Sequence, residues 1–396
     1  MKAKPASLGE KPVRDSLLSY GRQSIDDDDI AAVTEVLRSN WLTTGPKVAE
    51  FEKAFANVTG AREAVAISNG TAALHAAMYA LGIGPGDEVI VPALTFAASS
   101  NCVLYQGGTP VFADVQPDTL LVDPEDVATK ITPRTRAIVA VDYAGQPCDY
   151  DALRRLADKH GLALVADACH ALGGSYQGRA VGSLADLSTF SLHPVKPITT
   201  GEGGAITTDN PELAQRMRIF RSHGITTDHR QREQAGSWFY EMVDLGYNYR
   251  LTDLQCALGL SQLKKLPAWV ARRSEIAEQY DERFASLAEI QLPVVRAGCQ
   301  SGWHLYVIRL NLELLSGGRA DVFQALRAQN IGVQVHYIPV PWHPYYQKLG
   351  YRKGQWPVAE AAYERIISLP IFPAMSDRDV DDVVAACFKV IDAFRN

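Results

Sequence analysis

Long apolar segments are missing from this sequence of 396 residues. No run reaches the roughly 18 apolar residues that a helix needs to cross a bilayer. The segment 1–13 is polar and contains Pro5, Gly9 and Pro12, so it lacks the apolar core of a secretion signal. We therefore expect a cytoplasmic protein without a membrane partner.

Closely spaced cysteines are missing as well. The six cysteines lie far apart, and none belongs to a Cys-x-x-Cys pair. This spacing favours reduced thiols over a disulfide framework, and it argues against a structural zinc site. We expect no bound metal. The cysteines are Cys102, Cys148, Cys169, Cys256, Cys299 and Cys387.

A basic arm or stripe is also absent. The chain carries 39 Lys and Arg against 45 Asp and Glu, and its formal net charge of −6 is spread along the sequence. Nucleic acid is therefore a poor candidate partner. Hydrophobic residues make up 47% and charged residues 21% of the chain, which excludes a disordered or low-complexity protein.

Seven short runs rich in Val, Ile and Ala lie between residues 63 and 209, and helical patterns occupy most of the segments between them. Runs that are apolar throughout and separated by helices predict a mostly parallel sheet covered on both faces. We therefore expect a large α/β domain. The runs are Ala64–Ile67, Glu88–Val91, Val111–Val115, Ala137–Asp142, Leu162–Asp167, Leu187–Ser191 and Gly204–Thr207.

The second half of the chain predicts a smaller domain. An aromatic loop leads into a helix over Thr252–Lys265, which we expect Pro267 to interrupt before a further long helix. The pattern then becomes strand, helix, strand, strand and helix, which is typical of a small α+β domain. These elements are His304–Leu310, Arg319–Gln329, Val333–Tyr337, Ile366–Leu369 and Asp377–Phe394. We divide the chain into an arm (1–20), a large domain (21–266), and a connecting helix with the small domain (267–396).

The segment from Ser188 to Gly204 carries the clearest chemical signal. A buried-type strand ends at Ser191 and leads into a polar loop that holds one lysine, Lys196. A single lysine is more often a solvated surface charge. This one lies between apolar residues and prolines at the end of a strand, where ligands bind in open parallel sheets. Partial burial lowers the pKa of a lysine, which lets it act as an amine nucleophile.

Another strand ends at Asp167, and His170 follows it. A carboxylate is costly to bury unless it is paired with a cation. Asp167 therefore fits either a helix N-cap or a partner for a cationic ring nitrogen. His170 follows at the same edge of the sheet and is a candidate to pack on a cofactor or hydrogen-bond it.

The turn Ser68-Asn-Gly-Thr71 joins a strand to a helix. Gly70 lets the backbone approach a ligand closely, Thr71 offers a hydroxyl, and the free N–H groups of a helix start favour a phosphate. Such residues also begin many helices as caps. The turn lacks the Gly-x-x-x-x-Gly-Lys pattern of an ATP loop.

One cofactor accounts for all three segments. Pyridoxal phosphate (PLP) needs a lysine for its imine bond, an acid at its ring nitrogen and a cradle for its phosphate. Phe96, which follows another strand, is a candidate for an aromatic side chain stacked on the ring, although a place in the core explains it equally well. The sequence thus predicts a PLP enzyme in which Lys196, Asp167 and His170 are catalytic.

These motifs, in this order, resemble those of the DegT/DnrJ/EryC1/StrS family of sugar-nucleotide aminotransferases. The resemblance covers the chain from about Ser19 to the C-terminus. It rests on a lysine motif, an acid-and-histidine motif, a phosphate turn, an interface loop and a small-domain substrate motif. Here these are Ser191–Lys196 with Thr200–Gly204, Asp167–His170, Ser68–Thr71, Gly246–Leu251 and Val335–Tyr337.

The resemblance implies an α/β fold of the fold-type-I PLP aminotransferase kind, and a homodimer whose active sites are shared between subunits. It implies PLP as cofactor, with pyridoxamine phosphate (PMP) as the intermediate form. The implied cofactor-binding residues are Lys196, Asp167, His170, Gly70, Thr71, Phe96, Ser191 and, reaching across from the neighbouring subunit, Asn248. The implied substrate-binding residues are Arg250, His336 and Tyr337.

Within the family, Val141–Gly145, Phe220–Gly224 and Ala257–Lys265 resemble members that act in the pseudaminic acid pathway. This implies transfer of an amino group from L-glutamate to C4 of a UDP-linked 4-keto-6-deoxy-N-acetylhexosamine. An aminotransferase for another 4-keto or 3-keto nucleotide sugar is the alternative. Some relatives carry histidine in place of Lys196 and dehydrate sugars, so the lysine favours amino transfer. The complete set of cofactor residues argues against a regulator or a scaffold without turnover.

Overall fold

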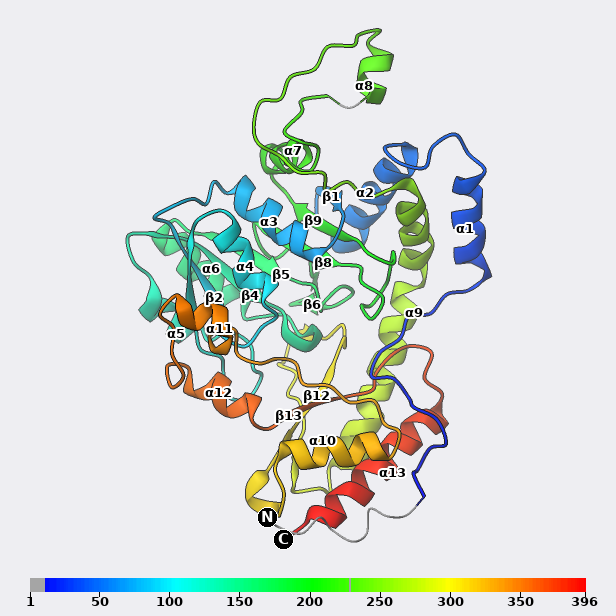
Figure 1. Ribbon diagram of the computed structural model, residues 1–396, viewed down its shortest axis with the longest axis vertical. Coiled ribbons are helices and arrows are strands. Elements are labelled where there is room, and N and C mark those ends of the chain that lie inside the picture. Colours follow the sequence, from blue (N-terminus) through cyan, green and yellow to red (C-terminus); the bar gives the residue numbers. More distant parts are fainter. Residues whose placement is uncertain (1–10, 228) are drawn as a thin grey trace.

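The computed structural model describes residues 11–227 and 229–396, so half of the predicted arm lies outside the described residues. Its main sheet has seven strands in the order β1-β9-β8-β5-β4-β2-β3. Only β9 runs antiparallel to its neighbours, which confirms the prediction of a mostly parallel sheet (Figure 1). The strands are β1 (Glu63–Ile67), β2 (Glu88–Pro92), β3 (Thr109–Ala113), β4 (Thr135–Val141), β5 (Ala163–Asp167), β8 (Leu187–Ser191) and β9 (Gly204–Thr208).

Both faces of this sheet are covered. Every residue of β2 and β9 is buried, although successive side chains of a strand point to opposite faces. The helices of this part are α1 (Asp27–Leu37), α2 (Pro46–Thr59), α3 (Gly70–Ala80), α4 (Ala98–Tyr105), α5 (Pro124–Lys130), α6 (Tyr150–His160), α7 (Pro211–Phe220) and α8 (His229–Gln234), with a 3-10 turn η2 (Tyr143–Gly145) after β4.

The long helix α9 (Asp253–Phe284) corrects one expectation, because it runs unbroken through Pro267. A proline inside a helix costs about 3 kcal/mol through its missing N–H and its ring. Pro267 is exposed, while Leu263 and Leu266 before it and Val270 after it are buried. Burial of this face on both sides of the proline offsets its cost. The helix therefore links the main sheet to the smaller part of the molecule without a break (Figure 1).

The smaller part contains a three-stranded sheet in the order β10-β12-β13. The predicted strand Val333–Tyr337 is wrong. Gln334 alone pairs there, exchanging backbone hydrogen bonds with Ser368 of β13. Beyond Gln334 the chain turns toward the main sheet, where the carbonyl oxygen of His336 accepts a hydrogen bond from the hydroxyl of Tyr143, in η2. The third strand comes instead from residues shortly after α9.

Most of the remaining elements complete the smaller part and the loops that join it to the larger one, while two short helices that follow β12 pack back against the core of the main sheet. Strands β10 (Ile290–Gln291), β12 (Tyr306–Leu310) and β13 (Ile366–Leu369) form the small sheet, and β6 (Ser175–Tyr176), β7 (Arg179–Ala180) and β11 (Cys299–Gln300) form a third sheet. The helical segments are η3 (Leu312–Leu314), α10 (Arg319–Ala328), η4 (Val340–Trp342), α11 (Pro344–Lys348), α12 (Pro357–Tyr363) and α13 (Asp377–Phe394).

The buried apolar residues form two clusters. One surrounds the seven-stranded sheet, and the other lies between the small sheet, α10, α13 and the second half of α9. Ile276, Tyr280 and Phe284 of α9 belong to the second cluster, whereas Leu263 and Leu266 belong to the first. The two halves of α9 are therefore packed into different cores.

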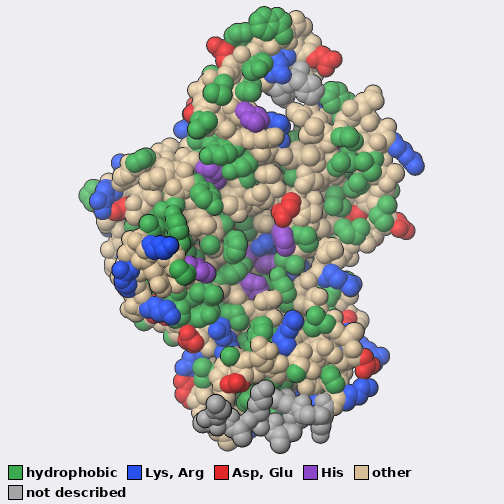
Figure 2. All heavy atoms as spheres, in the orientation of Figure 1, with side chains coloured by type: hydrophobic (Ala, Val, Ile, Leu, Met, Phe, Trp, Pro, Cys, Tyr) green, Lys and Arg blue, Asp and Glu red, His purple; other side chains and the backbone are tan. Residues whose placement is uncertain are grey.

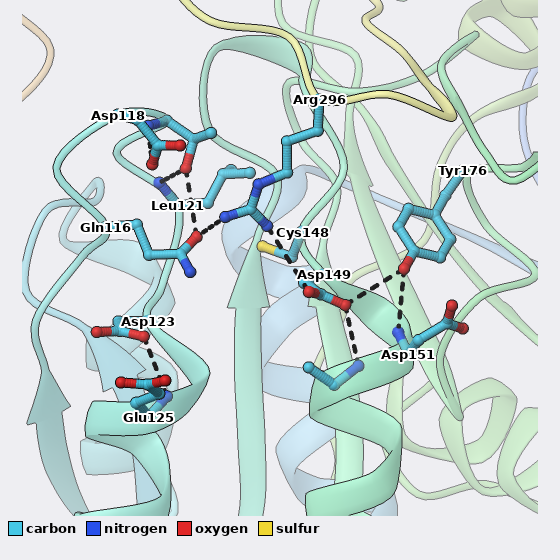
Figure 3. Close-up of polar contacts among 12 residues, drawn as sticks. Gln116, Asp118, Leu121, Asp123, Glu125, Cys148, Asp149, Asp151, Tyr176 and Arg296 are labelled. Carbon is cyan, nitrogen blue, oxygen red and sulfur yellow. Dashed lines mark hydrogen bonds and ion pairs between the residues drawn. The ribbon is translucent and has the colours of Figure 1, made fainter.

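Polar contacts tie the segment before β11 to the main sheet (Figure 3). The guanidinium of Arg296 contacts the side-chain oxygen of Gln116 and lies 4.0 Å from a carboxylate oxygen of Asp149. The backbone N–H of Arg296 also donates to the side chain of Gln146 at 2.7 Å. These bonds fix the path by which the chain returns toward the edge of the large sheet.

No helix among the described residues is long and apolar enough to cross a membrane. The same part of the chain contains no group of three or more His, Cys, Asp or Glu side chains placed to hold a metal ion.

Candidate active site

A pocket of about 650 Å³ opens at the edge of the sheet where β5 and β8 end. In a parallel sheet this is the edge at which ligands bind. Figure 2 shows histidine side chains gathered in the middle of the molecule, between the two parts of the fold. Nine residues predicted from the sequence line the pocket: Gly70, Thr71, Phe96, Asp167, His170, Ser191, Lys196, His336 and Tyr337.

Lys196 lies in the loop that leaves β8, in a turn closed by a hydrogen bond from its N–H to the carbonyl of His193. Its ammonium group forms no hydrogen bond or ion pair with any residue that the structure describes. Burial lowers the pKa of Lys196 below its usual value, and Cys169 and Asp167 oppose that shift. The pocket therefore holds an unpaired amine that burial makes easier to deprotonate, which suits a nucleophile.

Asp167 is the last residue of β5, and its carboxylate is buried. It accepts hydrogen bonds from the hydroxyl of Ser99 at 2.6 Å and from the N–H of Cys169 at 3.3 Å. Within the described chain, no Lys, Arg or His nitrogen comes within ion-pair distance of it. A buried carboxylate is costly without a cation, so the environment of Asp167 fits a positively charged group bound in the pocket.

The start of α3 and the end of β8 approach closely beside these two residues. Asn69 caps the helix by accepting from the N–H of Ala72, while the structure gives the N–H groups of Gly70 and Thr71 no partner among the described residues. A Cβ atom at Gly70 would lie 2.9 Å from that of Ser191. The free N–H groups, the helix dipole and the Ser191 hydroxyl form a cradle that suits a phosphate.

The residues present therefore fit PLP. The amine of Lys196 lacks a partner, the carboxylate of Asp167 lacks a cation, and the cradle at Gly70 lacks an anion. PLP offers an aldehyde, a protonated ring nitrogen and a phosphate to these three groups. A metal ion would need a donor cluster of a kind that the described residues do not form.

His170 is held in one tautomer by its neighbours. The N–H of Ala144 donates to Nδ1 at 3.3 Å, so the ring proton resides on Nε2, which lies 3.1 Å from the hydroxyl oxygen of Tyr337. Burial, and secondarily the charge of Lys196, hold the pKa of His170 well below its usual value. His170 is therefore a neutral hydrogen-bond donor in this pocket.

His304 also lines the pocket, and the sequence analysis missed it. Its ring lies 4.5 Å from that of His170, it is buried, and its Nδ1 has no hydrogen-bond partner. The turn η2 positions it, because the carbonyls of Ala144 and Gly145 accept from the N–H groups of Leu305 and Gly302. A histidine at the start of a predicted strand gives no signal of this contact.

Tyr20 is a second pocket residue that the sequence analysis missed. Its ring lies 5.4 Å from that of His336, and its carbonyl accepts a hydrogen bond from the N–H of Ile371. The sequence predicts this residue to be the last of the arm (1–20), at the margin of the family resemblance. Nearby Leu18 packs into the core of the smaller part, which holds this segment across the pocket.

Phe96 is not a core residue. Its side chain is 56% exposed, it lines the pocket, and its ring lies 5.7 Å from that of Tyr337. The position suits an aromatic ring that packs against a bound molecule.

Asn248 and Arg250 do not join the other site residues within one chain. Asn248 pairs with Ser222 through its backbone. Arg250 lines a separate pocket of about 310 Å³ at the root of the segment that carries α8. No carboxylate among the described residues forms an ion pair with Arg250.

Residues 23–388 match the model of the DegT/DnrJ/EryC1/StrS aminotransferase family. The chain is 44% identical over 381 residues to the spore coat polysaccharide biosynthesis protein SpsC of Bacillus subtilis, covering 96% of this chain and 98% of SpsC. Family membership therefore extends over nearly the whole length of the chain.

Solved structures give the same result. The putative sugar aminotransferase Spr1654 of Streptococcus pneumoniae in its PMP form superposes with a TM-score of 0.90 at 34% identity, covering 95% of this chain and all (100%) of that one. A PLP form of Spr1654 superposes with a TM-score of 0.89. PseC of Helicobacter pylori, an aminotransferase in the biosynthesis of pseudoaminic acid, superposes with a TM-score of 0.89 at 34% identity over 96% of this chain and 100% of PseC. The chain belongs to the DegT/DnrJ/EryC1/StrS aminotransferase family and is a PLP-dependent sugar aminotransferase.

Proposed function

We propose that the protein transfers the amino group of L-glutamate to C4 of a UDP-linked 4-keto-6-deoxy-N-acetylhexosamine. The product is then UDP-4-amino-4,6-dideoxy-N-acetyl-β-L-altrosamine, a precursor of pseudaminic acid. One observation carries the reaction type. The unpaired amine of Lys196 lines the same pocket as the buried carboxylate of Asp167, which has no cation within ion-pair distance among the described residues. The choice of acceptor is supported by the sequence motifs and by the likeness to PseC.

Residues of the chain have separate roles in this reaction. PLP, when bound, supplies an electron sink for the carbanion formed at the carbon that bears the nitrogen. Asp167 keeps the ring nitrogen of the cofactor protonated by placing a negative charge beside it. Lys196, once its amine is displaced, removes the Cα proton of glutamate and later delivers a proton to C4 of the acceptor.

The remaining pocket residues bind and orient. Gly70, Thr71 and Ser191 hold the phosphate of the cofactor, and Phe96 packs against its ring. Neutral His170 donates a hydrogen bond from its Nε2–H group inside the pocket. His336, whose pKa burial lowers to about 4, stays uncharged at neutral pH and contacts the sugar together with Tyr337.

A homodimer with shared sites is part of this proposal. The segment between α7 and α9 projects from the body of the protein, with apolar side chains at its tip (Figures 1 and 2). Trp238 is 84% exposed there, and Met242 and Leu245 are exposed as well. A second copy that covers this apolar surface would also bring Asn248 and Arg250 to the neighbouring pocket, where the phosphates of cofactor and nucleotide need partners.

The direct test is to incubate the purified enzyme with PLP, L-glutamate and a panel of keto sugars, and to identify products by mass spectrometry and NMR. The panel contains the UDP-linked 4-keto-6-deoxy-N-acetylhexosamine of L-arabino configuration, other 4-keto nucleotide sugars and a 3-keto nucleotide sugar. We expect an amine at C4 of the first substrate, in the altro configuration of the proposed product, with 2-oxoglutarate formed in equal amount. Amination of another panel member in preference to it would refute the proposed acceptor while leaving the reaction type intact.

A further inference from the structure

His304 has hydrogen-bonding capacity that no described residue uses. Its side chain is only 4% exposed, it lines the cofactor pocket, and its ring lies 4.5 Å from that of His170. Its Nδ1 is enclosed and has no hydrogen-bond partner, and the structure gives its Nε2 no partner among the described residues either. A buried polar group without a partner is costly, so this imidazole fits a ligand that contacts it inside the pocket.

The ring proton of His304 belongs on Nε2. Enclosing an unpaired N–H group is costlier than enclosing an unpaired acceptor, and Nδ1 is the enclosed nitrogen. Burial, and secondarily the charge of Lys196, hold the pKa of His304 well below its usual value, so the ring is neutral at neutral pH. His304 therefore offers an N–H donor, and its ligand must accept a hydrogen bond.

The backbone beside His304 is strained. Trp303, directly before it, lies in the left-handed region at a φ of 45°. This conformation is an outlier for a bulky side chain. Backbone strain of this kind persists only where the surrounding structure holds it, and it is concentrated at binding and active sites.

Neighbouring segments hold this strained residue in place. The guanidinium of Arg273, in α9, donates to the carbonyl of Trp303 at 3.0 Å, and the N–H of Trp303 donates to the hydroxyl of Ser301 at 3.1 Å. Gly145 of η2 packs against the same peptide, since a Cβ there would lie 2.6 Å from the nitrogen of Trp303 and 3.0 Å from that of His304. His304 is therefore fixed in the pocket before any ligand binds.

An anionic substrate finds few cations in this pocket. Lys196 is the only lysine or arginine among the described residues that line it, and the same lining contains the carboxylates of Asp167 and Glu202. The amine of Lys196 is occupied by the bond to the cofactor and by proton transfer. A carboxylate bound beside Lys196 therefore needs a neutral N–H donor from this chain.

The position of His304 suits the carboxylate nearest to the reacting carbon. Of the charges around His304, that of Lys196 lowers its pKa most, and both residues line the same pocket. The α-carboxylate of an amino acid is bonded to the carbon whose proton Lys196 removes, so it must lie beside that amine. The keto sugar already has partners in His336 and Tyr337.

We propose that His304 binds the α-carboxylate of the amino donor, with its Nε2–H group donating to a carboxylate oxygen. This subsite rests on the proposed donor, L-glutamate, and it does not depend on which sugar accepts the amino group.

Binding of amino acids that cannot react tests the subsite without turnover. 2-Methyl-L-glutamate lacks the Cα proton, and 4-amino-4-methylpentanoate is its matched control because a methyl group replaces the α-carboxylate. We would measure the dissociation constants of both by calorimetry for the PLP-loaded wild type and three variants. His304→Ala and His304→Phe remove the donor, and the second fills the space of the ring. His304→Gln keeps an N–H donor on its side chain.

A hydrogen bond to a charged group is lost in the first two variants, so we expect them to bind 2-methyl-L-glutamate about tenfold more weakly or worse. Their affinity for 4-amino-4-methylpentanoate is expected to stay within about twofold of the wild type. We expect His304→Gln to recover most of the lost affinity. Melting temperature and PLP content show whether each variant is folded and loaded.

Two results would overturn the subsite. One is unchanged affinity for 2-methyl-L-glutamate in the variants without the donor. The other is an equal loss of affinity for both ligands, because it would leave His304 with a purely structural role.

The outcome is separable from that of the proposed function. If the UDP-linked keto sugar is aminated but binding of 2-methyl-L-glutamate does not depend on His304, only the subsite fails. If that binding depends on His304 but another keto sugar is aminated in preference, only the proposed acceptor fails.

Discussion

The hydroxyl of Ser99 donates a hydrogen bond to the carboxylate of Asp167, with 2.6 Å between Oγ and Oδ2. Ser99 has one proton, so the 2.7 Å contact between its oxygen and that of Thr95 requires Thr95 to be the donor there. All three side chains are buried. This chain of hydroxyls fixes the position of the carboxylate at the end of β5.

Removing the Ser99 hydroxyl tests its support of Asp167. A hydrogen bond to a charged group contributes about 1.5–3 kcal/mol, so Ser99→Ala is expected to weaken PLP binding on the order of tenfold. Ser100→Ala is the matched control, since the Ser100 hydroxyl contacts Tyr346 instead of Asp167. Fluorescence titration of the apoenzymes with PLP measures both. Equal affinity in Ser99→Ala and wild type would show that the bond does not support the cofactor site.

The narrow contact between α3 and β8 makes Gly70 sensitive to substitution. In Gly70→Ala the new Cβ would lie 2.9 Å from Cβ of Ser191, so the phosphate cradle must widen. Overpacking of this kind costs about 1–3 kcal/mol, and we expect a lower melting temperature and weaker PLP binding. Gly84→Ala is the control, because its Cβ would meet no atom within 4 Å. Retention of full PLP affinity by Gly70→Ala would contradict the proposed cradle.

Buried His75 predicts a pH dependence of stability. It contacts the hydroxyl of Tyr249 and the amide of Gln106, and burial lowers its pKa from 6.5 to about 4. Between these values the unfolded chain binds a proton at His75 that the folded chain does not, so stability rises as the pH rises from about 4 to 6.5. His75→Phe removes this contribution. We expect a shallower rise of melting temperature with pH in that window, and an unchanged slope would refute the assignment.

Mixing two damaged subunits tests the shared site. Lys196→Ala lacks the amine, and Asn248→Ala lacks the side chain proposed to reach the neighbouring pocket. A mixed dimer combines the intact Lys196 of one chain with the intact Asn248 of the other, so random mixing restores about a quarter of wild-type activity. Activity is assayed after refolding the two together. If the mixture never exceeds the average of its components, Asn248 acts within its own chain or not at all.

The sequence predicts the large sheet well because its strands are continuous apolar runs, a pattern that depends little on distant contacts. It also places Asp167 and Ser191 correctly at strand ends, which meet at one edge in any parallel sheet. It fails where tertiary contacts override local pattern. Burial on both sides of Pro267 keeps α9 intact, and beyond Gln334 a strand-like segment turns toward the main sheet, where Tyr143 contacts His336.

Some pocket residues are not indicated by the sequence, and the physical reason is the same for each. Tyr20 and His304 reach the pocket only because distant segments dock there, through the backbone bonds of Ile371 and Ala144. Neither residue carries a local motif. Ser99 was missed because a serine inside a helix gives no sign that it faces a carboxylate on another strand.

The central claim is that the amine of Lys196 forms the covalent bond to PLP. Reduction of the PLP-loaded enzyme with borohydride, followed by proteolysis and mass spectrometry, identifies the lysine that carries the cofactor. We predict loss of the yellow colour on reduction and one phosphopyridoxyl group on the peptide containing Lys196, with no label in Lys196→Ala. A label on any other lysine, or a reduced enzyme that carries no label, would contradict the account.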